Sequence, residues 1–401
     1  MIKKIKDSFK YIKIKDILSL FIFLFIIIPA LLLKLFNKIF KKEIWLVAER
    51  ENTASDNGYH FYKYLKEKHP EVNSYYIINK KCKEYNKVKE FGNIIQYGSL
   101  KHWLYYLASD HKISTQKASS PAPALFYVLH IYFNLFNNRV YLKHGIIKDD
   151  AEYWYYKNTK YKVIICGARD EYNFIKDNFG YPEEYVKYTG LARFDNLHDN
   201  NVNKKQILVI PTWRNWLGRE TNILQKKEVF TETKYFKSWK KFLDNKKLLK
   251  YLKENDLELV FYPHINMKKF IKDFSIKNNK IKVINDEIDI QTLLKESALM
   301  ITDFSSVYMD FAYMKKPVIY YQFDKDEYRQ KQLKQGYFVY EENGFGDVLV
   351  DSNDVVDKLI YYVDNNYKIE RKYLKRMNDF FELNDSNNCE RIYKAIVGDK
   401  K

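Results

Sequence analysis

The sequence predicts an α/β protein with two Rossmann-like, doubly wound domains that face each other across a cleft, preceded by a membrane-associated segment. Three observations lead to this prediction. A chain of 401 residues is long enough for two domains. Short apolar runs alternate with segments of helical periodicity, a pattern typical of parallel strands separated by helices. Nearly every polar cluster of interest follows a predicted strand, where open α/β sheets bind their ligands.

Residues 1–43 form a basic and apolar N-terminal segment. Residues 17–33 are apolar except for Ser19, which places them at the lower length limit for a membrane-spanning helix, and Pro29 could kink that helix. Lysines flank the segment on both sides, so the positive-inside rule gives no orientation. A segment lying in or dipping into the inner leaflet, with both flanks cytoplasmic, explains this pattern better than a true span.

Composition narrows the possible functions. The net charge of +18 favours a polyanionic partner or an anionic membrane, although the general richness in Lys explains the charge equally well. The three cysteines are far apart and form no CxxC pair, so a reducing compartment fits best. The chain has no GxGxxG and no GxxxxGK[ST] motif, which disfavours dinucleotide and P-loop sites, and no carboxylates at metal-ligand spacing.

The N-terminal Rossmann-like domain is predicted over residues 44–200. Its apolar runs predict strands at 44–47, 75–78, 94–95, 139–142 and 163–166, and helical periodicity predicts helices at 59–68 and 100–109. Residues 199–205 are polar and rich in Asn, which predicts a linker.

The C-terminal Rossmann-like domain is predicted over residues 201–375. Strands are expected at 207–210, 257–262, 281–284, 299–302 and 318–321, with a helix at 290–297. Residues 215–240 are expected to form an irregular insertion, and Asp324-Lys325-Asp326 a solvated loop. The tail from Asp354 is predicted to be largely helical, and residues 376–401 are expected to form a helix that could cross back to the first domain.

The stretch from 298 to 324 organises the predicted second domain. A buried strand ends at Asp303, and Ser305 and Ser306 follow where a helix would begin. The unpaired N–H groups and the positive dipole of such a helix end attract a phosphate. Asp310 is four residues past Ser306, on the same helix face, and could hold a ribose hydroxyl. The alternative is that one serine is only the N-cap of this helix.

Two clusters in the first domain are candidates for the same site. His144 and Gly145 follow the strand at 139–142, where a histidine can act as a general base and a glycine lets a ligand approach the backbone. Lys148 can meet a phosphate. Arg193 could clamp a phosphate through its fork of donors, or else form a structural pair with Asp195.

Two further clusters follow strands of the second domain. Thr212 and Arg214 are expected to contact phosphate, and Trp213 a base or sugar, although a lone Trp more often belongs to the core. His264 follows Pro263 and could contact a phosphate or a leaving group.

Taken in chain order, these pieces resemble the CDP-glycerol glycerophosphotransferase family, the teichoic-acid polymerases and primases. The resemblance covers residues 45–397 and rests on His144-Gly145 with Lys148, Gly190 to Asp195, Pro211 to Arg214, His264, Thr302 to Asp310 with Lys316-Pro317, and Asp385 to Arg391. The chain departs from the family pattern at Lys143, before the His-Gly pair, and at Ala192, where the family has proline. These departures leave subfamily and substrate open, so a capsule enzyme fits as well as a wall teichoic-acid enzyme.

The resemblance implies a GT-B fold and a metal-independent transfer with no cofactor. Polyol phosphate, glycerol phosphate in the first instance, would pass from a CDP-activated donor to the hydroxyl of a lipid-linked polyanionic acceptor, and CMP would leave. His144 would be the base, and Ser305, Ser306, Arg193 and His264 would stabilise the diphosphate, with Asp310 on the donor sugar. The enzyme would act at the cytoplasmic face of the cell membrane, on an anionic lipid surface and without nucleic acid.

Two other functions remain compatible with the residues. The first is a nucleotide-sugar glycosyltransferase of the same GT-B fold, acting in surface polysaccharide synthesis. The second is a basic membrane- or nucleic-acid-binding protein without catalysis, but no nucleic-acid-binding motif accompanies the aromatic residues. Glycerol and ribitol, and primase and polymerase, are not distinguished by the sequence.

Overall fold

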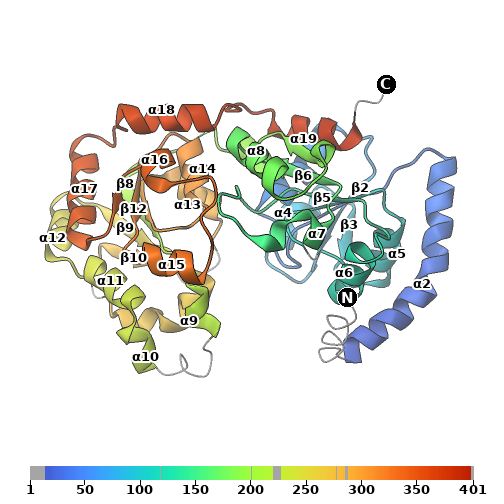
Figure 1. Ribbon diagram of the computed structural model, residues 1–401, viewed down its shortest axis with the longest axis horizontal. Coiled ribbons are helices and arrows are strands. Elements are labelled where there is room, and N and C mark those ends of the chain that lie inside the picture. The colour runs from blue at the N-terminus through green and yellow to red at the C-terminus, as the bar shows by residue number, and fades with distance from the viewer. Residues whose placement is uncertain are drawn as a thin grey trace.

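The computed structural model describes residues 14–117, 119–199, 201–219, 227–276, 278–284 and 288–398. Within them lie two wholly parallel sheets, one in each half of the chain, with helices on both faces (Figure 1). This confirms the predicted class: an α/β fold of two Rossmann-like domains. The basic residues before Ile14 lie outside the described residues.

The first sheet has seven strands in the order β3-β2-β1-β4-β5-β6-β7. The strands are β1 Trp45–Ala48, β2 Ser74–Ile78, β3 Ile94–Gln96, β4 His111–Ser114, β5 Arg139–Tyr141, β6 Val163–Cys166 and β7 Val186–Tyr188. The helices between them are α3 Asn57–Lys68, α4 Tyr85–Lys89, α5 Leu100–Ala108, α6 Pro123–Ile131, α7 Tyr156–Thr159 and α8 Arg169–Asn178, with short 3-10 turns η1 Glu152–Trp154, η2 Glu183–Tyr185 and η3 Ala192–Asn196. The order reverses beside β1, so the carboxyl ends of β1, β4 and β5 meet at a switch point, where such sheets bind ligands.

The second sheet has six strands in the order β10-β9-β8-β11-β12-β13. They are β8 Asn203–Ile210, β9 Glu258–Phe261, β10 Ile281–Val283, β11 Ser297–Thr302, β12 Val318–Tyr321 and β13 Val348–Leu349. The helices are α9 Asn215–Arg219, α10 Lys227–Glu232, α11 Lys234–Leu243, α12 Lys246–Glu254, η4 Ile265–Phe274, α13 Ile290–Glu296, α14 Tyr308–Tyr313, α15 Lys325–Lys331, α16 Tyr340–Asn343, α17 Ser352–Asp364 and α18 Arg371–Phe380. All of β11 is buried, which explains its uninterrupted apolar run.

Two expectations for this domain are wrong. Residues 203–205, expected in a linker, begin strand β8, because β8 extends past its apolar core to pair with β11 at Ser297. The stretch expected to be an irregular insertion is helical over α9, α10 and α11, and residues 220–226 lie outside the described residues. Helix α11 buries Trp239 and Phe242 in the core, so this stretch is part of the domain and not an appendage.

The N-terminal helix α2 runs from Ile14 to Ile39, past the apolar run that predicted it, with Pro29 inside. It lies along the outer edge of the first domain, away from the second (Figure 1). One face packs on α5 and α6, where Ala30 is buried and the Phe23 ring lies 6.4 Å from that of Phe126. The C-terminal helix α19, Asn388–Val397, crosses back and packs on α3, β6 and η3 of the first domain, and the Asp195 carboxylate caps its first turn.

Candidate active site

A histidine–carboxylate pair stands at the carboxyl end of β5. Nδ1 of His144 is hydrogen-bonded to Oδ2 of Asp56, at the start of α3, and 64% of the histidine side chain is exposed. Because Nδ1 is engaged by a carboxylate, it carries the ring proton, and Nε2 is the nitrogen left for a substrate. This arrangement orients a general base and stabilises it once it is protonated.

A second carboxylate holds the loop that carries Asp56. The buried Glu49 accepts hydrogen bonds from the backbone N–H groups of Ser55, Asp56 and Tyr59 at 3.1, 2.9 and 2.8 Å. Burial, and then the charge of Asp56, raise the pKa of Glu49 to about 7. Sequence reasoning missed both carboxylates, although the polar loop after the first strand was the available signal.

The turn that carries His144 is held in place by a buried ion pair. Lys143 adopts a left-handed conformation with φ of 62°. Its Nζ lies 2.6 Å from Oε1 of Glu171, and neither side chain has any exposed area. The same carboxylate accepts from the backbone N–H of Gly167 at 2.7 Å and from that of Ile147. A buried pair that also ties down two backbone segments leaves the turn little freedom.

Charges around His144 determine its protonation. The carboxylate of Asp56 and its hydrogen bond raise the pKa of His144 above 6.5, outweighing the partial desolvation of the ring and the charges of Arg193 and Arg50. Burial alone would raise the pKa of Asp56, but the charges of His144 and Arg193 hold it well below its usual value. Asp56 therefore stays ionised at neutral pH.

Replacing Asp56 with asparagine tests this coupling. In the native protein, a base with a raised pKa loses activity on the acid side, so kcat/KM should fall as the pH drops through a value above 6.5. Without the carboxylate, the partial desolvation of the ring and the nearby arginines lower the pKa of His144, and the acid limb should move to lower pH. The pH dependence of kcat/KM for both proteins measures the move, and coinciding acid limbs would contradict the pairing.

The second domain meets this turn directly. A Cβ built on Gly145 would lie 3.1 Å from Oγ of Ser306, so a side chain in place of this glycine would press on the serine. Helix α14 begins at Tyr308, later than expected, and its N-cap is Val307, which has no side-chain cap. Ser305 Oγ accepts from the Val307 N–H at 3.4 Å, whereas the hydroxyl of the half-buried Ser306 forms no hydrogen bond with the described residues. The alternative that a serine is only the N-cap of this helix is therefore wrong for Ser306, whose hydroxyl is available.

His264 lies at the carboxyl end of β9, immediately before η4. Its Nδ1 accepts from the backbone N–H of Asn266 at 3.2 Å, so Nε2 carries the ring proton. Desolvation and the charge of Arg50 lower its pKa. The side chain is thus a neutral N–H donor at pH 7, the opposite tautomer to His144.

Arg50 belongs to the site, and sequence reasoning missed it. It directly follows the buried Glu49 after β1, is exposed, and its charge acts on both His144 and His264. Its side chain forms no ion pair with the described residues. The only early signal was its position after a strand.

Arg193 and Asp310 lie together because their side chains bind each other. Nε and Nη2 of Arg193 contact the two carboxylate oxygens of Asp310 at 2.6 and 2.8 Å, and Nη1 contacts Asp56 and the His144 carbonyl oxygen at 2.9 and 3.0 Å. This buried bidentate pair joins the domains. Their expected contacts with phosphate and sugar stay predictions, whereas the alternative pairing of Arg193 with Asp195 is wrong, because Asp195 caps α19.

Three other expected ligands are buried. Arg214 has no exposed area, and its guanidinium lies 2.8 Å from both Asp303 and Asp324, so its expected phosphate contact stays a prediction, whereas the solvated loop expected at Asp324 is wrong. Trp213 packs in the core beside Phe270, which supports the packing alternative. Lys148 is buried and paired with Asp149 at 2.7 Å. Asp149 in turn contacts Arg329 of the second domain at 2.5 Å.

Thr212 remains a candidate. Its backbone N–H donates to Asp303 at 2.8 Å, while its hydroxyl oxygen is buried and has no partner among the described residues. A buried hydroxyl without a partner costs free energy unless a ligand completes it.

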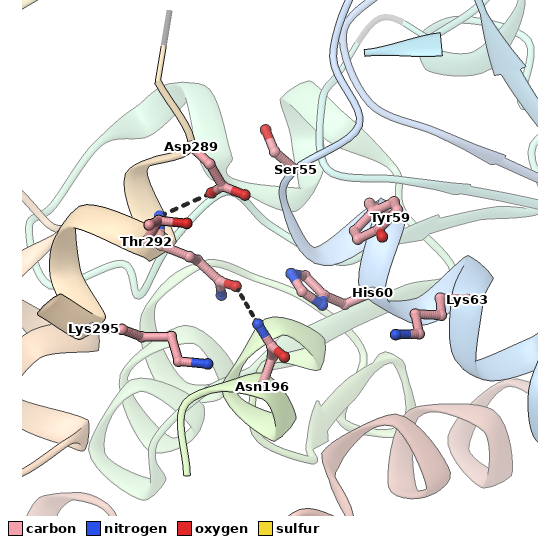
Figure 2. A pocket seen from close by; sticks show the side chains of 9 residues that line it. Ser55, Tyr59, His60, Lys63, Asn196, Asp289, Thr292 and Lys295 are labelled. Atoms are coloured by element: carbon pink, nitrogen blue, oxygen red, sulfur yellow. Dashed lines mark hydrogen bonds between the residues drawn. The ribbon is translucent and has the colours of Figure 1, made fainter. Parts of the chain in front are cut away.

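A cavity of about 190 Å³ lies between α3 of the first domain and α13 of the second (Figure 2). Figure 2 shows Tyr59, His60 and Lys63 on one wall and Thr292 and Lys295 on the other. Asn196 closes one side through a 2.9 Å hydrogen bond to Gln291, which also contacts the Arg193 carbonyl oxygen at 3.2 Å. The cavity is therefore a polar part of the cleft, adjacent to the Arg193–Asp310 pair.

Two Rossmann-like domains that close over a histidine–carboxylate pair and a serine pair define a GT-B-type transferase. The chain belongs to the CDP-glycerol:poly(glycerophosphate) glycerophosphotransferase family, whose model matches residues 30–398. The resemblance drawn from the sequence motifs is confirmed.

Relatives and solved structures agree with this assignment. The chain is 36% identical over 380 residues to the minor teichoic acid biosynthesis protein GgaB of Bacillus subtilis (strain 168), covering 92% of this chain and 41% of that protein. It is 26% identical over 259 residues to a teichoic acid poly(glycerol phosphate) polymerase of Bacillus spizizenii, covering 60% of each. The structure of the wall teichoic acid polymerase TagF aligns with a TM-score of 0.64 at 17% identity, covering 92% of this chain and 97% of that one, which supports the GT-B fold. The chain thus spans less than two thirds of these two relatives.

Proposed function

We propose that the protein transfers a polyol phosphate, glycerol phosphate in the first instance, from a CDP-activated donor to a hydroxyl of a surface-polymer acceptor. One observation supports this above the others: the His144–Asp56 pair of one domain faces Ser306 of the other across the close approach at Gly145. A base and phosphate donors on opposite walls of one cleft suit an attack of a hydroxyl on phosphorus.

We assign the two histidines opposite roles in the reaction, because they hold opposite tautomers. Nε2 of His144 takes the proton of the acceptor hydroxyl as its oxygen attacks the distal phosphorus of the donor, and Asp56 stabilises the imidazolium. The bond between that phosphorus and the bridging oxygen breaks, and CMP leaves with the electron pair. The Nε2–H of His264 donates to a phosphate oxygen or to the leaving group, and Arg50 and the Ser306 hydroxyl offset the charge on phosphorus. These groups are all from the chain, so we propose a transfer that needs no metal cofactor.

Donor turnover tests the proposal. The full chain is incubated with a glycerol-phosphate oligomer as acceptor and with CDP-glycerol, CDP-ribitol or a UDP-sugar, and release of CMP or UDP is followed. We expect CMP from a CDP-polyol, unchanged by EDTA. UDP release alone would indicate a glycosyltransferase, and loss of turnover in EDTA would contradict the metal-independent step.

The serine pair gives a separate prediction. Ser305→Ala with Ser306→Ala should weaken CDP-glycerol binding by about 1–3 kcal/mol, because charged phosphate oxygens lose donors, and should leave free cytidine nearly unaffected. Calorimetric titration with both ligands measures the difference. Equal losses for the two ligands would exclude a phosphate contact, and a fall in stability of about 1 kcal/mol with unchanged affinity would indicate a structural role alone.

We further propose that α2 lies in the plane of the membrane at the cytoplasmic face. Residues 17–39 are apolar enough to cross a bilayer, with a mean hydropathy of 2.7. One face, however, packs on α5 and α6, while the outward residues are exposed, among them Phe21, Phe25 and Leu32. A helix bound along its length to a folded domain and apolar on its free face suits a monotopic attachment. If the full chain stayed in solution when lipid vesicles were sedimented, the proposed membrane attachment would be contradicted.

A further inference from the structure

A small cavity beneath α6 has no assigned role. It has a volume of about 80 Å³, which is the space of two to three waters and suits a phosphate group. Arg139, Lys117 and Tyr161 line it, together with Tyr127 and other residues of α6. Helix α6 lies on the first domain beside α2, away from the second domain (Figure 1).

The cations of this cavity have no carboxylate partner. Arg139 is only 8% exposed, and its hydrogen bonds go to the Asn137 side chain at 2.9 Å and to the Thr159 carbonyl oxygen. Lys117 donates to the Tyr153 carbonyl oxygen and lies 4.6 Å above the Trp154 ring. Among the described residues neither forms an ion pair. A buried guanidinium without a counter-charge is costly, so an anion in the cavity would stabilise it.

A third group points to the same conclusion. The hydroxyl of Tyr161 is buried and has no hydrogen-bond partner among the described residues, although its ring is 4.8 Å from the Arg139 guanidinium. Burial and the Arg139 charge also lower the pKa of Lys117 to about 8, a repulsion that a bound anion would relieve. His130, buried beside them, has its pKa lowered to about 3 and supplies no further charge.

The surroundings indicate where the anion comes from. Tyr127 lines the cavity and is 49% exposed, and its neighbour Val128 is 41% exposed. Phe133 continues this apolar surface, and α2 packs against α6 beside it. An anion site that opens beside an exposed apolar helix face suits a headgroup whose acyl chains lie in a bilayer.

We propose that this cavity holds the phosphate group of a membrane lipid, with Arg139, Lys117 and the Tyr161 hydroxyl as its donors. The bound headgroup would fix the depth and rotation of the first domain on the membrane. This inference rests on the membrane attachment proposed above, but not on the reaction at His144.

Vesicle binding of the full chain tests the assignment. Vesicles of digalactosyldiacylglycerol, an uncharged lipid without phosphate, carry either phosphatidic acid or, at the same surface charge, oleate, which has no phosphate either. We expect the native protein to bind the phosphatidic acid vesicles about tenfold more tightly, and Tyr161→Phe and Lys117→Gln to lose that preference. Tyr161→Phe removes only a hydroxyl without a protein partner, so its fold should be intact. Lys157→Gln, an exposed lysine paired with Glu152, is the matched control and should keep the preference.

The outcomes separate the possible occupants. Equal preference in the native protein and in both variants would overturn the site. Stabilisation of the native protein, but not of Tyr161→Phe, by inorganic phosphate in a thermal melt, without any vesicle preference, would make it a free-anion site and overturn the lipid assignment. Absence of binding to either vesicle would overturn both the attachment and this inference while leaving CMP release unaffected.

Discussion

Replacing His144 with alanine should lower kcat for CMP release by about 10²–10⁴-fold, the usual contribution of a positioned general base. The imidazole is the exposed member of its pair, and Asp56 lacks the reach to replace it, because its carboxylate is engaged by both His144 and Arg193. Donor affinity should change far less, since the proposed phosphate donors belong to other residues. Single-turnover rates at saturating donor measure the first effect, and calorimetric titration the second.

A second histidine provides the control for that experiment. His198 is exposed, hydrogen-bonded to the Tyr313 hydroxyl at 3.2 Å and not among the residues that line the cavity between the domains, so His198→Ala should keep near-native turnover. If His144→Ala also kept near-native turnover with an unchanged melting temperature, His144 would not be the base. A fall in donor affinity as large as the fall in kcat would indicate a binding role instead.

The fold was largely predictable because buried parallel strands are continuous apolar runs. Residues 163–166 and 318–321 form strands with the predicted bounds. Strand β4 escaped detection because its sequence, HKIS, is half polar: it buries Lys112, which donates to Asn138. Helices α9, α10 and α11 were not predicted. The periodicity near Trp216 is irregular, and the whole stretch was interpreted as one insertion although α11 is strongly amphipathic.

The site was predictable only in part. Position after a strand was the signal for His144, Ser306 and His264, since parallel strands bring their carboxyl ends to one edge, and their roles stay predictions. The position of an arginine after a strand does not show whether its side chain pairs with a ligand or with a carboxylate of the same chain. Arg214 is sequestered by partners 89 and 110 residues away, and such long-range pairing leaves no local signal in the sequence.

That buried cluster carries the largest expected effect on stability. Arg214 lies between two carboxylates, with Nε and Nη2 each 2.8 Å from an oxygen of Asp324 and Nη2 2.8 Å from Asp303. Neither Arg214 nor Asp303 has any exposed side-chain area, so water cannot replace a lost partner. Breaking such a buried pair from one side typically costs about 3–5 kcal/mol, because a charge remains buried without compensation.

Asp324→Ala should therefore lower the free energy of unfolding by about 3–5 kcal/mol, and Asp324→Asn, which keeps the shape and one acceptor, by less. Asp326→Ala is the matched control: this aspartate is two residues away and exposed, so its loss should change stability by less than about 0.5 kcal/mol. Urea denaturation followed by tryptophan fluorescence, with an unchanged slope, gives the three values. If Asp324→Ala and Asp326→Ala were equally stable and donor affinity fell only in the first, Arg214 would be a phosphate ligand after all, and the buried cluster would not be what holds it.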